Sequence, residues 1–346
     1  MHRNAPSHSK NIHQWAHIAH SSRFWRIVLH WHFLFGDAPL RSHMTSIRII
    51  GVPMDLGASR RGVDMGPFAI RYTDLRARLE RLGHTVEDAG NITVPFREDA
   101  ERGAQRGARF LGAITEVCTK VATETRSALT AGARPLVLGG DHSLSAGSIA
   151  GASAHFADKG EKIGVIWIDA HGDLHTPGSS RSGNVHGMPL AHLLGHGDQG
   201  LAGIGGKTPS VQAEHVVLVG TRDLDVPERE HTAKWKLATL TMRALDERGV
   251  RGVMDEAIAI ASKGTAGIWV SFDMDAVDPG AAPGVGTAVP GGMTYREAHL
   301  VMEMLADSGK ILGIDLVEVN PVLDERNRTA EVATALLLSA FGQRIL

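Results

Sequence analysis

The sequence predicts an α/β domain with a mostly parallel central sheet. Short apolar runs recur along the chain, and they are continuous rather than alternating, as expected for parallel strands buried on both faces. Segments with helical periodicity separate these runs. With 346 residues, 43% of them hydrophobic, and 40 glycines, the chain can bury a large core and form many turns.

The first half of the predicted domain starts with a strand and then alternates. Apolar residues at helical spacing from Ile70 to Leu82 predict one helix, which Gly83 ends. The expected order is strand, helix, strand and helix, over residues 46–53, 66–83, 84–90 and 104–131.

The second half repeats one arrangement, in which an apolar run passes into a turn. These runs predict strands within residues 135–143, 162–173, 215–225, 267–275 and 310–321, and helices over 294–308 and 329–341. The loops 174–188 and 278–292 are rich in Gly, Pro and Ser. Loops of this length in a compact domain are usually functional or mobile.

Residues 1–43 differ in composition from the rest of the chain. They contain 8 of the 19 histidines and 3 of the 6 tryptophans, and Asp37 is their only acidic residue. We expect a leader that is disordered or not native, because the segment from Met44 enters a strand at once. An organelle transit peptide and a loose metal-binding tract are the alternatives. The remaining residues, 44–346, are predicted to form a single catalytic domain.

The composition argues against several classes of protein. A formal net charge of −2 gives no support for binding nucleic acid or an anionic membrane. No apolar run reaches the roughly 18 residues of a membrane span. The single cysteine, Cys118, cannot form an intrachain disulfide, and its apolar neighbours predict a core thiol. We expect a cytoplasmic protein; a mitochondrial location would follow if residues 1–43 were a transit peptide.

Metal-ligand residues follow three of the predicted strands. Ligands of parallel sheets bind beyond the carboxyl ends of the strands. Residues two apart in an extended backbone point to the same side, so the carboxylates and imidazoles at these ends can aim at common points. The six candidate ligands are His142, Asp169, His171, Asp173, Asp273 and Asp275.

The number and type of these ligands favour two divalent cations. Four clustered carboxylates would repel one another without cations, and some would have to protonate. Six side chains are too many for one ion with an open position, but they suit two ions that share bridging carboxylates. Hydrolases with two metals hold them roughly 3.5–4 Å apart and trap a hydroxide between them. Oxygen-rich ligation without thiolates favours Mn²⁺ over Zn²⁺.

Isolated Asp and His residues more often have structural roles. We expect Asp141 to be the N-cap of the helix after "GGDHS", and His192 and His196 to lie on the surface of a helix and a turn. Three strand ends that carry Asp and His at alternate positions are harder to explain in this way.

Several segments resemble the signature segments of the ureohydrolase family, and most closely those of its arginase members. They are "GGDHS", "DAHGD", "SGNVHGMP" and "SFDMDAVDP", with further matches in "RRGVDMGPFAIR" and "DLVEVNP". The resemblance covers about residues 47–342. It implies a three-layer α/β/α fold with a parallel sheet, as in a group of related deacetylases. It further implies hydrolysis of the guanidino group of L-arginine to L-ornithine and urea by a metal-bridged hydroxide, and assembly as a homotrimer or homohexamer.

The resemblance also implies a role for each site residue. Two Mn²⁺ ions per subunit would be held, one by His142, Asp169, Asp173 and Asp273, and the other by His171, Asp169, Asp273 and Asp275, with Asp169 and Asp273 bridging. Asp173 would also orient the hydroxide, His186 would carry a proton to the leaving amine, and Glu318 would pair with the guanidinium. The substrate's α-carboxylate and α-amino group would be bound by Ser180, Ser182 and Asn184, and by Asp225 and Glu228, respectively.

His175 departs from the family pattern, in which an Asn that contacts the substrate carboxylate usually occupies this position. We hypothesise that His175 changes the affinity for the substrate tail, or its pH dependence, and leaves the metal chemistry alone.

Three alternatives to arginine hydrolysis remain open. An agmatinase or guanidinobutyrase would use the same chemistry on a different tail, but such enzymes usually lack the "SGN" segment. A single-zinc deacetylase would not need both Asp173 and the Asp273–Asp275 pair. A non-catalytic metal-binding oligomeric scaffold would have no use for His186 and Glu318. Urea-excreting, biosynthetic and nitrogen-scavenging roles would share one active site.

Overall fold

The computed structural model describes residues 44–101 and 107–344, and its strands form one parallel sheet. The eight strands of this part of the chain are ordered β2-β1-β3-β8-β7-β4-β5-β6. Every neighbouring pair is parallel. Their bounds are β1 Ser46–Val52, β2 Thr85–Asn91, β3 Arg134–Gly139, β4 Gly164–Ile168, β5 Val216–Val219, β6 Ala238–Leu240, β7 Ile268–Asp273 and β8 Ile311–Val317.

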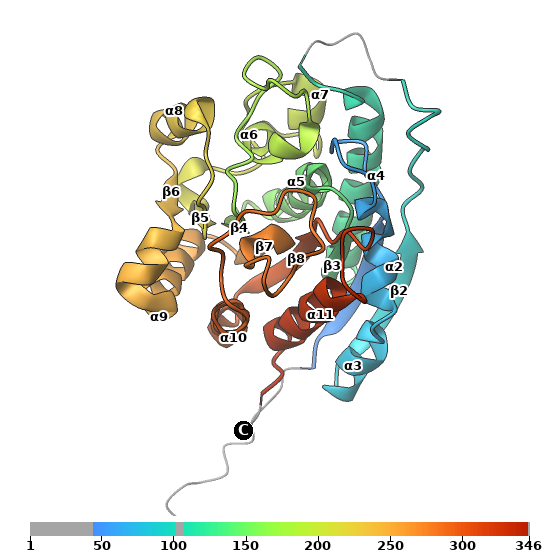
Figure 1. Ribbon diagram of the computed structural model, residues 1–346, viewed down its shortest axis with the longest axis vertical. Helices are drawn as coiled ribbons and strands as arrows, with labels where there is room; N and C mark the ends of the chain where they lie inside the picture. Colours follow the sequence, from blue (N-terminus) through green and yellow to red (C-terminus); the bar gives the residue numbers. More distant parts are fainter. Residues whose placement is uncertain (1–43, 102–106, 345–346) are drawn as a thin grey trace, which may run out of the picture. The chain divides into compact units, whose positions relative to one another are not determined.

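Helices cover both faces of this sheet, so the predicted three-layer α/β/α fold is confirmed (Figure 1). One face packs against α2 (Gly66–Arg71), α3 (Leu75–Arg81), α9 (Met242–Ser262), α10 (Tyr295–Ser308) and α11 (Arg328–Ala340). The other face packs against α4 (Leu111–Thr130), α5 (Ser145–Ala157), α6 (Pro189–Leu193) and α7 (Gln199–Ala202). The helix α8 (Val226–Trp235) follows β5.

The two cores explain why the strand sequences are continuously apolar. In β4, Val165 and Trp167 belong to one core, whereas Ile166 and Ile168 belong to the other, and all four are fully buried. Because successive side chains of a strand point to opposite faces, both sets must be apolar when helices cover both faces.

Local backbone conformation corrects several predicted boundaries. The helix predicted over 66–83 is two helices, α2 and α3, because Asp74 adopts a left-handed φ of 60° between them. The helix predicted from residue 104 begins at Leu111, after Phe110 with a φ of 57°; residues 102–106 lie outside the described residues. β6 was not predicted, because its three residues are too few to give a pattern.

The sheet order brings the predicted ligand-bearing strands together. β8 lies between β3 and β7, and β7 pairs with β4, so the carboxyl ends of these four strands are neighbours at the centre of the sheet. The predicted core thiol Cys118 is fully buried on α4, where burial raises the pKa of its thiol. Within the described residues, every helix is too short or too polar to cross a bilayer. The predicted leader, residues 1–43, lies outside the described residues.

Candidate active site

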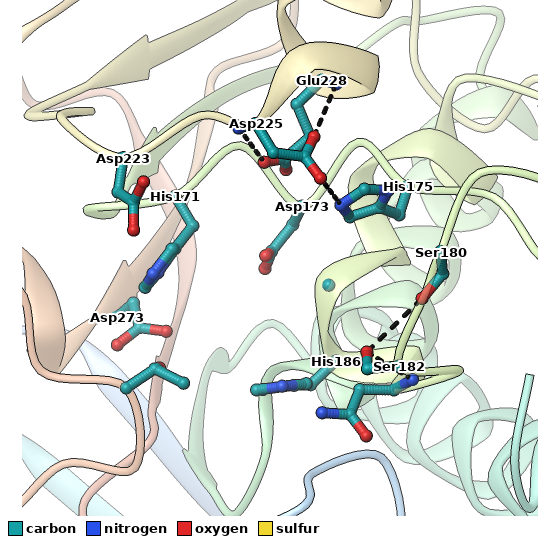
Figure 2. Close-up of a pocket in the computed structure, with 13 residues that line it drawn as sticks. His171, Asp173, His175, Ser180, Ser182, His186, Asp223, Asp225, Glu228 and Asp273 are labelled. Atoms are coloured by element: carbon teal, nitrogen blue, oxygen red, sulfur yellow. Dashed lines mark hydrogen bonds and ion pairs between the residues drawn. The ribbon is translucent and has the colours of Figure 1, made fainter.

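A cavity of about 240 Å³ opens beyond the carboxyl ends of the central strands (Figure 2). Nearly all of the residues that line it have polar side chains, and they come from segments distant in the sequence. The predicted site residues that line it are His171, Asp173, His175, Ser180, Ser182, Asn184, His186, Asp225, Glu228 and Asp273, and the remaining lining residues are Gly187, Asp223 and Thr287. The predicted residues His142, Asp169, Asp275 and Glu318 lie deeper and do not line it.

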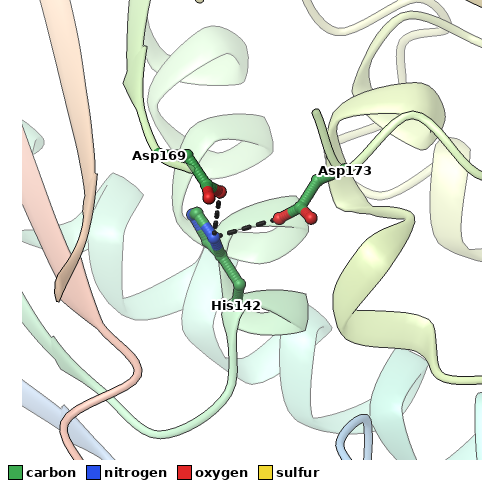
Figure 3. A group of neighbouring side chains, drawn as sticks. All are labelled: His142, Asp169 and Asp173. Carbon is green, nitrogen blue, oxygen red and sulfur yellow. Dashed lines mark ion pairs between the residues drawn. The ribbon is translucent and has the colours of Figure 1, made fainter. Parts of the chain in front are cut away.

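A buried His/Asp group lies at the floor of this cavity. His142 begins a 3₁₀ turn directly after β3, and Asp169 and Asp173 follow β4 (Figure 3). His142 Nδ1 lies 3.2 Å from Asp169 Oδ2, 3.0 Å from Asp173 Oδ2 and 3.2 Å from Asp273 Oδ2. Three carboxylates from two strands therefore converge on one imidazole nitrogen.

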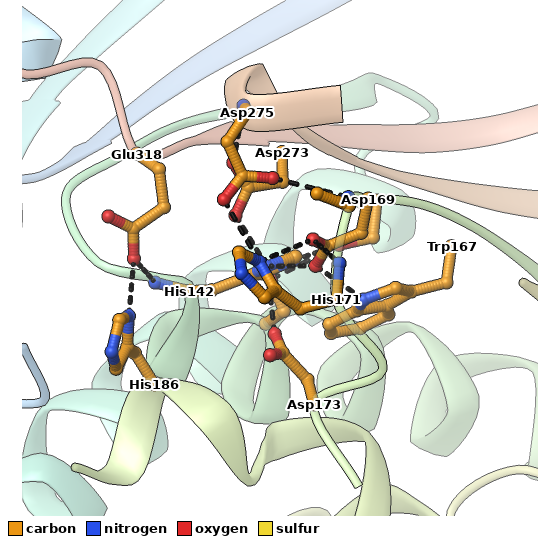
Figure 4. Close-up of polar contacts among 12 residues, drawn as sticks. His142, Trp167, Asp169, His171, Asp173, His186, Asp273, Asp275 and Glu318 are labelled. Atoms are coloured by element: carbon orange, nitrogen blue, oxygen red, sulfur yellow. Dashed lines mark hydrogen bonds and ion pairs between the residues drawn. The ribbon is translucent and has the colours of Figure 1, made fainter. Parts of the chain in front are cut away.

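A second group shares Asp169 with the first. His171 Nδ1 lies 3.0 Å from Asp275 Oδ2 and 3.4 Å from Asp169 Oδ1 (Figure 4). One oxygen of Asp169 thus faces each imidazole, and Asp169 Oδ2 also accepts a hydrogen bond from Trp167 Nε1 at 3.0 Å. A carboxylate that faces two groups with different oxygens has the geometry of a bridging ligand.

The pKa values in this cluster indicate an excess of negative charge. Burial raises the pKa of Asp173 to about 7, and the Asp169 carboxylate adds to the shift. Burial, followed by Asp275 and Asp169, raises the pKa of Asp273 well above its ordinary value. Burial alone would lower the pKa of His142, but the surrounding carboxylates raise it well above its ordinary value. Divalent cations would neutralise this charge.

Two unpartnered atoms in the cluster also fit a bound cation. His142 Nδ1 and Asp173 Oδ2 are buried, and neither makes a hydrogen bond of acceptable geometry with the described residues, although they lie 3.0 Å apart. Buried polar atoms without a hydrogen bond are rare, and a bound ion is one explanation for them. Two converging groups of oxygen and nitrogen donors therefore suit divalent metal ions.

His186 and Glu318 form a pair between the floor and the cavity. His186 Nδ1 lies 3.0 Å from Glu318 Oε1, which also accepts a hydrogen bond from the His142 backbone amide at 3.0 Å. Burial would lower the pKa of His186, but the charge of Glu318 and its hydrogen bond raise that pKa to about 9. Glu318 Oε2 is buried and makes no hydrogen bond with the described residues. Glu318 is not among the residues that line the cavity.

The backbone is strained at two of the predicted catalytic residues. Asp173 has a φ of 51° and Glu318 a φ of 65°, both in the left-handed region that non-glycine residues rarely adopt. Such conformations cost about 1–3 kcal/mol and persist where the surrounding structure fixes them, often at functional sites.

The mouth of the cavity is built from loop 174–188 and the start of α8. Asp225 caps α8: its Oδ1 accepts a hydrogen bond from the Glu228 amide at 3.1 Å, completing a capping box. His175 joins this helix to the loop, because its Nε2 lies 3.2 Å from Asp225 Oδ2 and its Nδ1 lies 3.1 Å from Ser179 Oγ. Both ring nitrogens of His175 are therefore already engaged within the protein.

Three residues that line the cavity, Gly187, Asp223 and Thr287, were not predicted from the sequence, and the predicted position of His192 was wrong. Asp223 stands two positions before Asp225, the same spacing that identified Asp169 and His171, so its signal was available. Thr287 belongs to loop 278–292 and donates a hydrogen bond to Asp275 Oδ2 at 3.0 Å. The surface position predicted for His192 is wrong, because it is fully buried.

The structure also tests the structural roles predicted for His192, His196 and Asp141. His192 Nδ1 lies 2.8 Å from the Met188 carbonyl oxygen, so His192 is a hydrogen-bonded residue of the core. His196, also predicted at the surface, is half-buried and stacks on Trp235, with ring centroids 4.0 Å apart. Asp141 is an N-cap as predicted, but of the 3₁₀ turn His142–Leu144 that leads into α5: its side chain accepts a hydrogen bond from the Ser143 amide.

Comparison with known proteins connects this geometry to one family. The family model described as "Arginase family" matches residues 45–342. An arginase from Brevibacillus brevis is 50% identical over 301 residues, which are 87% of this chain and 99% of that protein. The structure of the arginase from Bacillus caldovelox is similar with a TM-score of 0.83 at 48% identity, covering 88% of this chain and 100% of that one. An Entamoeba histolytica arginase in complex with L-ornithine gives a TM-score of 0.79 at 30% identity, covering 87% and 99%.

Proposed function

The chain belongs to the arginase family, and from this premise we propose how its site works. The reaction is the hydrolysis of L-arginine. Water adds to the guanidino carbon, the bond from that carbon to the side-chain nitrogen breaks, and urea and L-ornithine leave. The main observation that supports this function is that the buried His/Asp groups and His186 converge on one cavity with polar side chains.

A metal cofactor follows from the family and from the His/Asp groups. We propose two Mn²⁺ per subunit, one held by His142, Asp169, Asp173 and Asp273, and the other by His171, Asp169, Asp273 and Asp275. When bound, these ions would supply a hydroxide near neutral pH and stabilise the charge that develops at the guanidino carbon. The convergence of carboxylates on His142, and the contact of each Asp169 oxygen with a different imidazole, support this assignment.

The chain's own residues would orient the reactants and move the proton. Asp173 accepts a hydrogen bond from the attacking nucleophile and holds it toward the substrate carbon. Glu318 offers its unpartnered Oε2 to the guanidinium. Because Glu318 occupies Nδ1 of His186, Nε2 carries the proton to the leaving nitrogen. A pKa of about 9 keeps His186 protonated at neutral pH, as a general acid requires.

The mouth of the cavity would recognise the α-amino acid end of the substrate. We propose that Ser180, Ser182 and Asn184 bind the carboxylate and that Asp225 and Glu228 bind the amino group, in part through water. The presence of all five side chains around the cavity supports arginine over agmatine, which has no carboxylate to bind. The bound L-ornithine in the Entamoeba relative supports the same product. Both nitrogens of His175 are engaged, which supports an indirect role, through Asp225, in place of a direct contact with the carboxylate.

Urea release tests the proposed function. The Mn²⁺-loaded protein is given arginine, agmatine and 4-guanidinobutyrate in parallel, and bound metal is measured by mass spectrometry. We expect two Mn²⁺ per chain and turnover of arginine far above that of the other two. His186→Ala should lose turnover and retain both ions. Faster turnover of agmatine would instead support the agmatinase alternative, and no turnover with full metal content would support a scaffold.

The assembly, domain limits and location form the remaining part of this proposal. We infer that residues 44–346 make one catalytic domain, and that three or six copies assemble in the cytoplasm. The exposed side chains of Phe68 and Tyr72, of which Tyr72 is 85% exposed, line one mainly apolar pocket at the surface, which association would cover. Light scattering of the purified protein measures the number of copies, and fractionation of cells measures the location.

A further inference from the structure

Asp315 is a fully buried carboxylate that the proposed reaction does not use. It lies in β8, and its oxygens accept hydrogen bonds from four buried donors on neighbouring elements. The donors are Ser145 Oγ at 2.9 Å, Ser148 Oγ at 2.7 Å, Trp269 Nε1 at 2.6 Å and Ser271 Oγ. A carboxylate that is buried and accepts hydrogen bonds from four donors is held in one position.

One of these donors connects Asp315 to the metal-ligand candidate His142. Ser271 Oγ lies 2.9 Å from His142 Nε2. A serine hydroxyl has a single proton, and its nearer acceptor is Asp315 Oδ1 at 2.5 Å, since Ser145 Oγ lies 3.4 Å away. Ser271 Oγ must therefore accept the hydrogen bond from His142, which places a proton on Nε2.

The direction of this hydrogen bond decides which nitrogen of His142 is available to a metal. With a proton held on Nε2, the lone pair of the neutral ring lies on Nδ1, and Nδ1 is the atom that faces the carboxylates of Asp169, Asp173 and Asp273. The ring plane is fixed as well, because His142 stacks on Trp167 with centroids 4.2 Å apart and an interplanar angle of 10°. Stacking sets the plane, and Ser271 sets the rotation within it.

We propose that Asp315 is a positioning residue that acts through Ser271 to hold His142 with its Nδ1 turned toward the metal. The proposal rests on the proposed metal-binding role of His142. It assigns a function to a carboxylate and a hydroxyl that line no part of the cavity. Loss of the link should weaken the binding of one ion and leave the substrate-binding residues unchanged.

Two serine variants form a matched pair that tests this link. Ser271→Ala and Ser148→Ala each remove one hydroxyl that donates to Asp315, and both serines are fully buried. Only Ser271 also contacts His142. Any general loss of stability or metal affinity that follows from removing a hydrogen-bond donor to Asp315 should therefore appear in both variants. An effect that passes through His142 should appear in Ser271→Ala alone.

The readout is Mn²⁺ binding to the metal-depleted full-length protein, measured by equilibrium dialysis and by titration calorimetry. We expect Ser271→Ala to lower the affinity for one of the two Mn²⁺ ions by about 10–100-fold. This range is typical for the removal of a residue that hydrogen-bonds to a metal ligand. Ser148→Ala should change the affinity by less than about threefold, and both variants should melt at similar temperatures without metal. Asp315→Asn should lower the affinity for the same ion as Ser271→Ala does.

The possible results separate this proposal from the proposed function. Equal weakening by both serine variants, or tight binding of two ions by Ser271→Ala, overturns the positioning role. If Asp315→Asn does not fold, the serine pair alone decides. A wild-type protein that binds no Mn²⁺ would instead contradict the proposed metal site itself.

Discussion

The floor and the rim of the cavity differ in how their side chains are held. We call the six candidate metal ligands, His142, Asp169, His171, Asp173, Asp273 and Asp275, the floor. We call His175, Ser180, Ser182, Asn184 and Asp225 the rim. Of the floor side chains that form ion pairs, only His171 is more than 8% exposed, whereas 46% of the Asp225 side chain is exposed at the rim. Strand ends carry the floor, and a long loop and a helix N-terminus carry the rim.

This difference separates chemistry from selectivity. Interactions between charges are strong at the buried floor because little water screens them, and they are weak at the exposed rim. Substitutions at the floor should therefore abolish the reaction, and single substitutions at the rim should adjust binding. The following predictions test this division, from the largest expected effect to the smallest.

Asp273→Asn should abolish activity without destabilising the metal-free protein. If Asp273 bridges two ions as proposed, its loss removes several kcal/mol of transition-state stabilisation, so kcat should fall by roughly 10³-fold or more. Burial and the charges of Asp275 and Asp169 raise the pKa of Asp273 well above its ordinary value, so the neutral side chain relieves repulsion. Asn can still accept the Asp275 amide hydrogen bond, now 2.8 Å long.

Thermal melting with and without Mn²⁺ measures both halves of this prediction. The wild-type protein should melt at a higher temperature when Mn²⁺ is added, and Asp273→Asn should respond little. Without metal, the variant should melt at the same temperature as the wild type or above it. Asp225→Asn, a rim variant, serves as the control and should retain its response to Mn²⁺. A large loss of stability in metal-free Asp273→Asn would contradict this prediction. It would mean that the Asp273 carboxylate stabilises the metal-free protein through ion pairs with the histidines of the floor.

Glu318→Gln should lower the pKa of His186 from about 9 toward its ordinary value of about 6.5. The negative charge of Glu318 raises this pKa, so in the wild type the protonated form persists until the pH rises through about 9. In the variant, burial is no longer opposed by that charge, and the proton should be lost at a lower pH. The NMR signal of the His186 ring, followed against pH, measures the change. An unchanged pKa in Glu318→Gln would mean that other charges hold the proton, and Asp225→Asn again provides the control.

The floor could be predicted from the sequence because its signal is local. Asp169 and His171 stand two apart at the end of an apolar run, and extended backbone then brings their side chains to one side. The same rule applied to Asp223 and Asp225 would have found the missed residue Asp223. The order of the strands could not be derived in this way, although that order is what brings His142 to Asp273.

Other features depend on contacts between distant parts of the chain. His186 and Glu318 are 132 positions apart, and no local pattern gives their hydrogen bond. His192 looks like a surface residue in its short helix, yet packing of the surrounding loops buries it completely. Asp315 was passed over because a single acidic residue within an apolar strand has no pattern, and its partners come from β7 and α5. Long-range packing therefore hides these roles from the sequence.

His175→Ala should weaken arginine binding moderately without affecting the metals. His175 Nε2 lies 3.2 Å from Asp225 Oδ2, and removal of a partly exposed polar contact of this kind costs about 1 kcal/mol or less. KM for arginine should therefore rise up to about fivefold, with kcat and Mn²⁺ content unchanged. If His175 acts through Asp225 on the amino group, KM for 5-guanidinovalerate, which lacks that group, should not change.

The double variant His175→Ala/Asp225→Asn locates this effect. When the two residues act as a unit, the changes in KM of the single variants do not add. Additive changes would mean that His175 acts independently, for example by direct contact with the carboxylate. His175→Asn, which introduces the residue usual in the family, should lower KM if direct contact with the carboxylate is the better arrangement. An unchanged KM in both His175 variants would mean that the residue is a bystander.

Ser182→Ala should have the smallest effect of the series. The Ser182 side chain is exposed and accepts a hydrogen bond from the Asn184 amide at 3.2 Å, a contact that water can replace. We expect KM for arginine to rise by less than about threefold and the free energy of unfolding to change by about 0.5 kcal/mol or less. Steady-state kinetics and urea denaturation measure the two quantities. A rise in KM of tenfold or more would mean that the rim is held as rigidly for substrate binding as the floor is for metal binding. The exposure of a side chain would then no longer distinguish residues that select the substrate from residues that carry out the reaction.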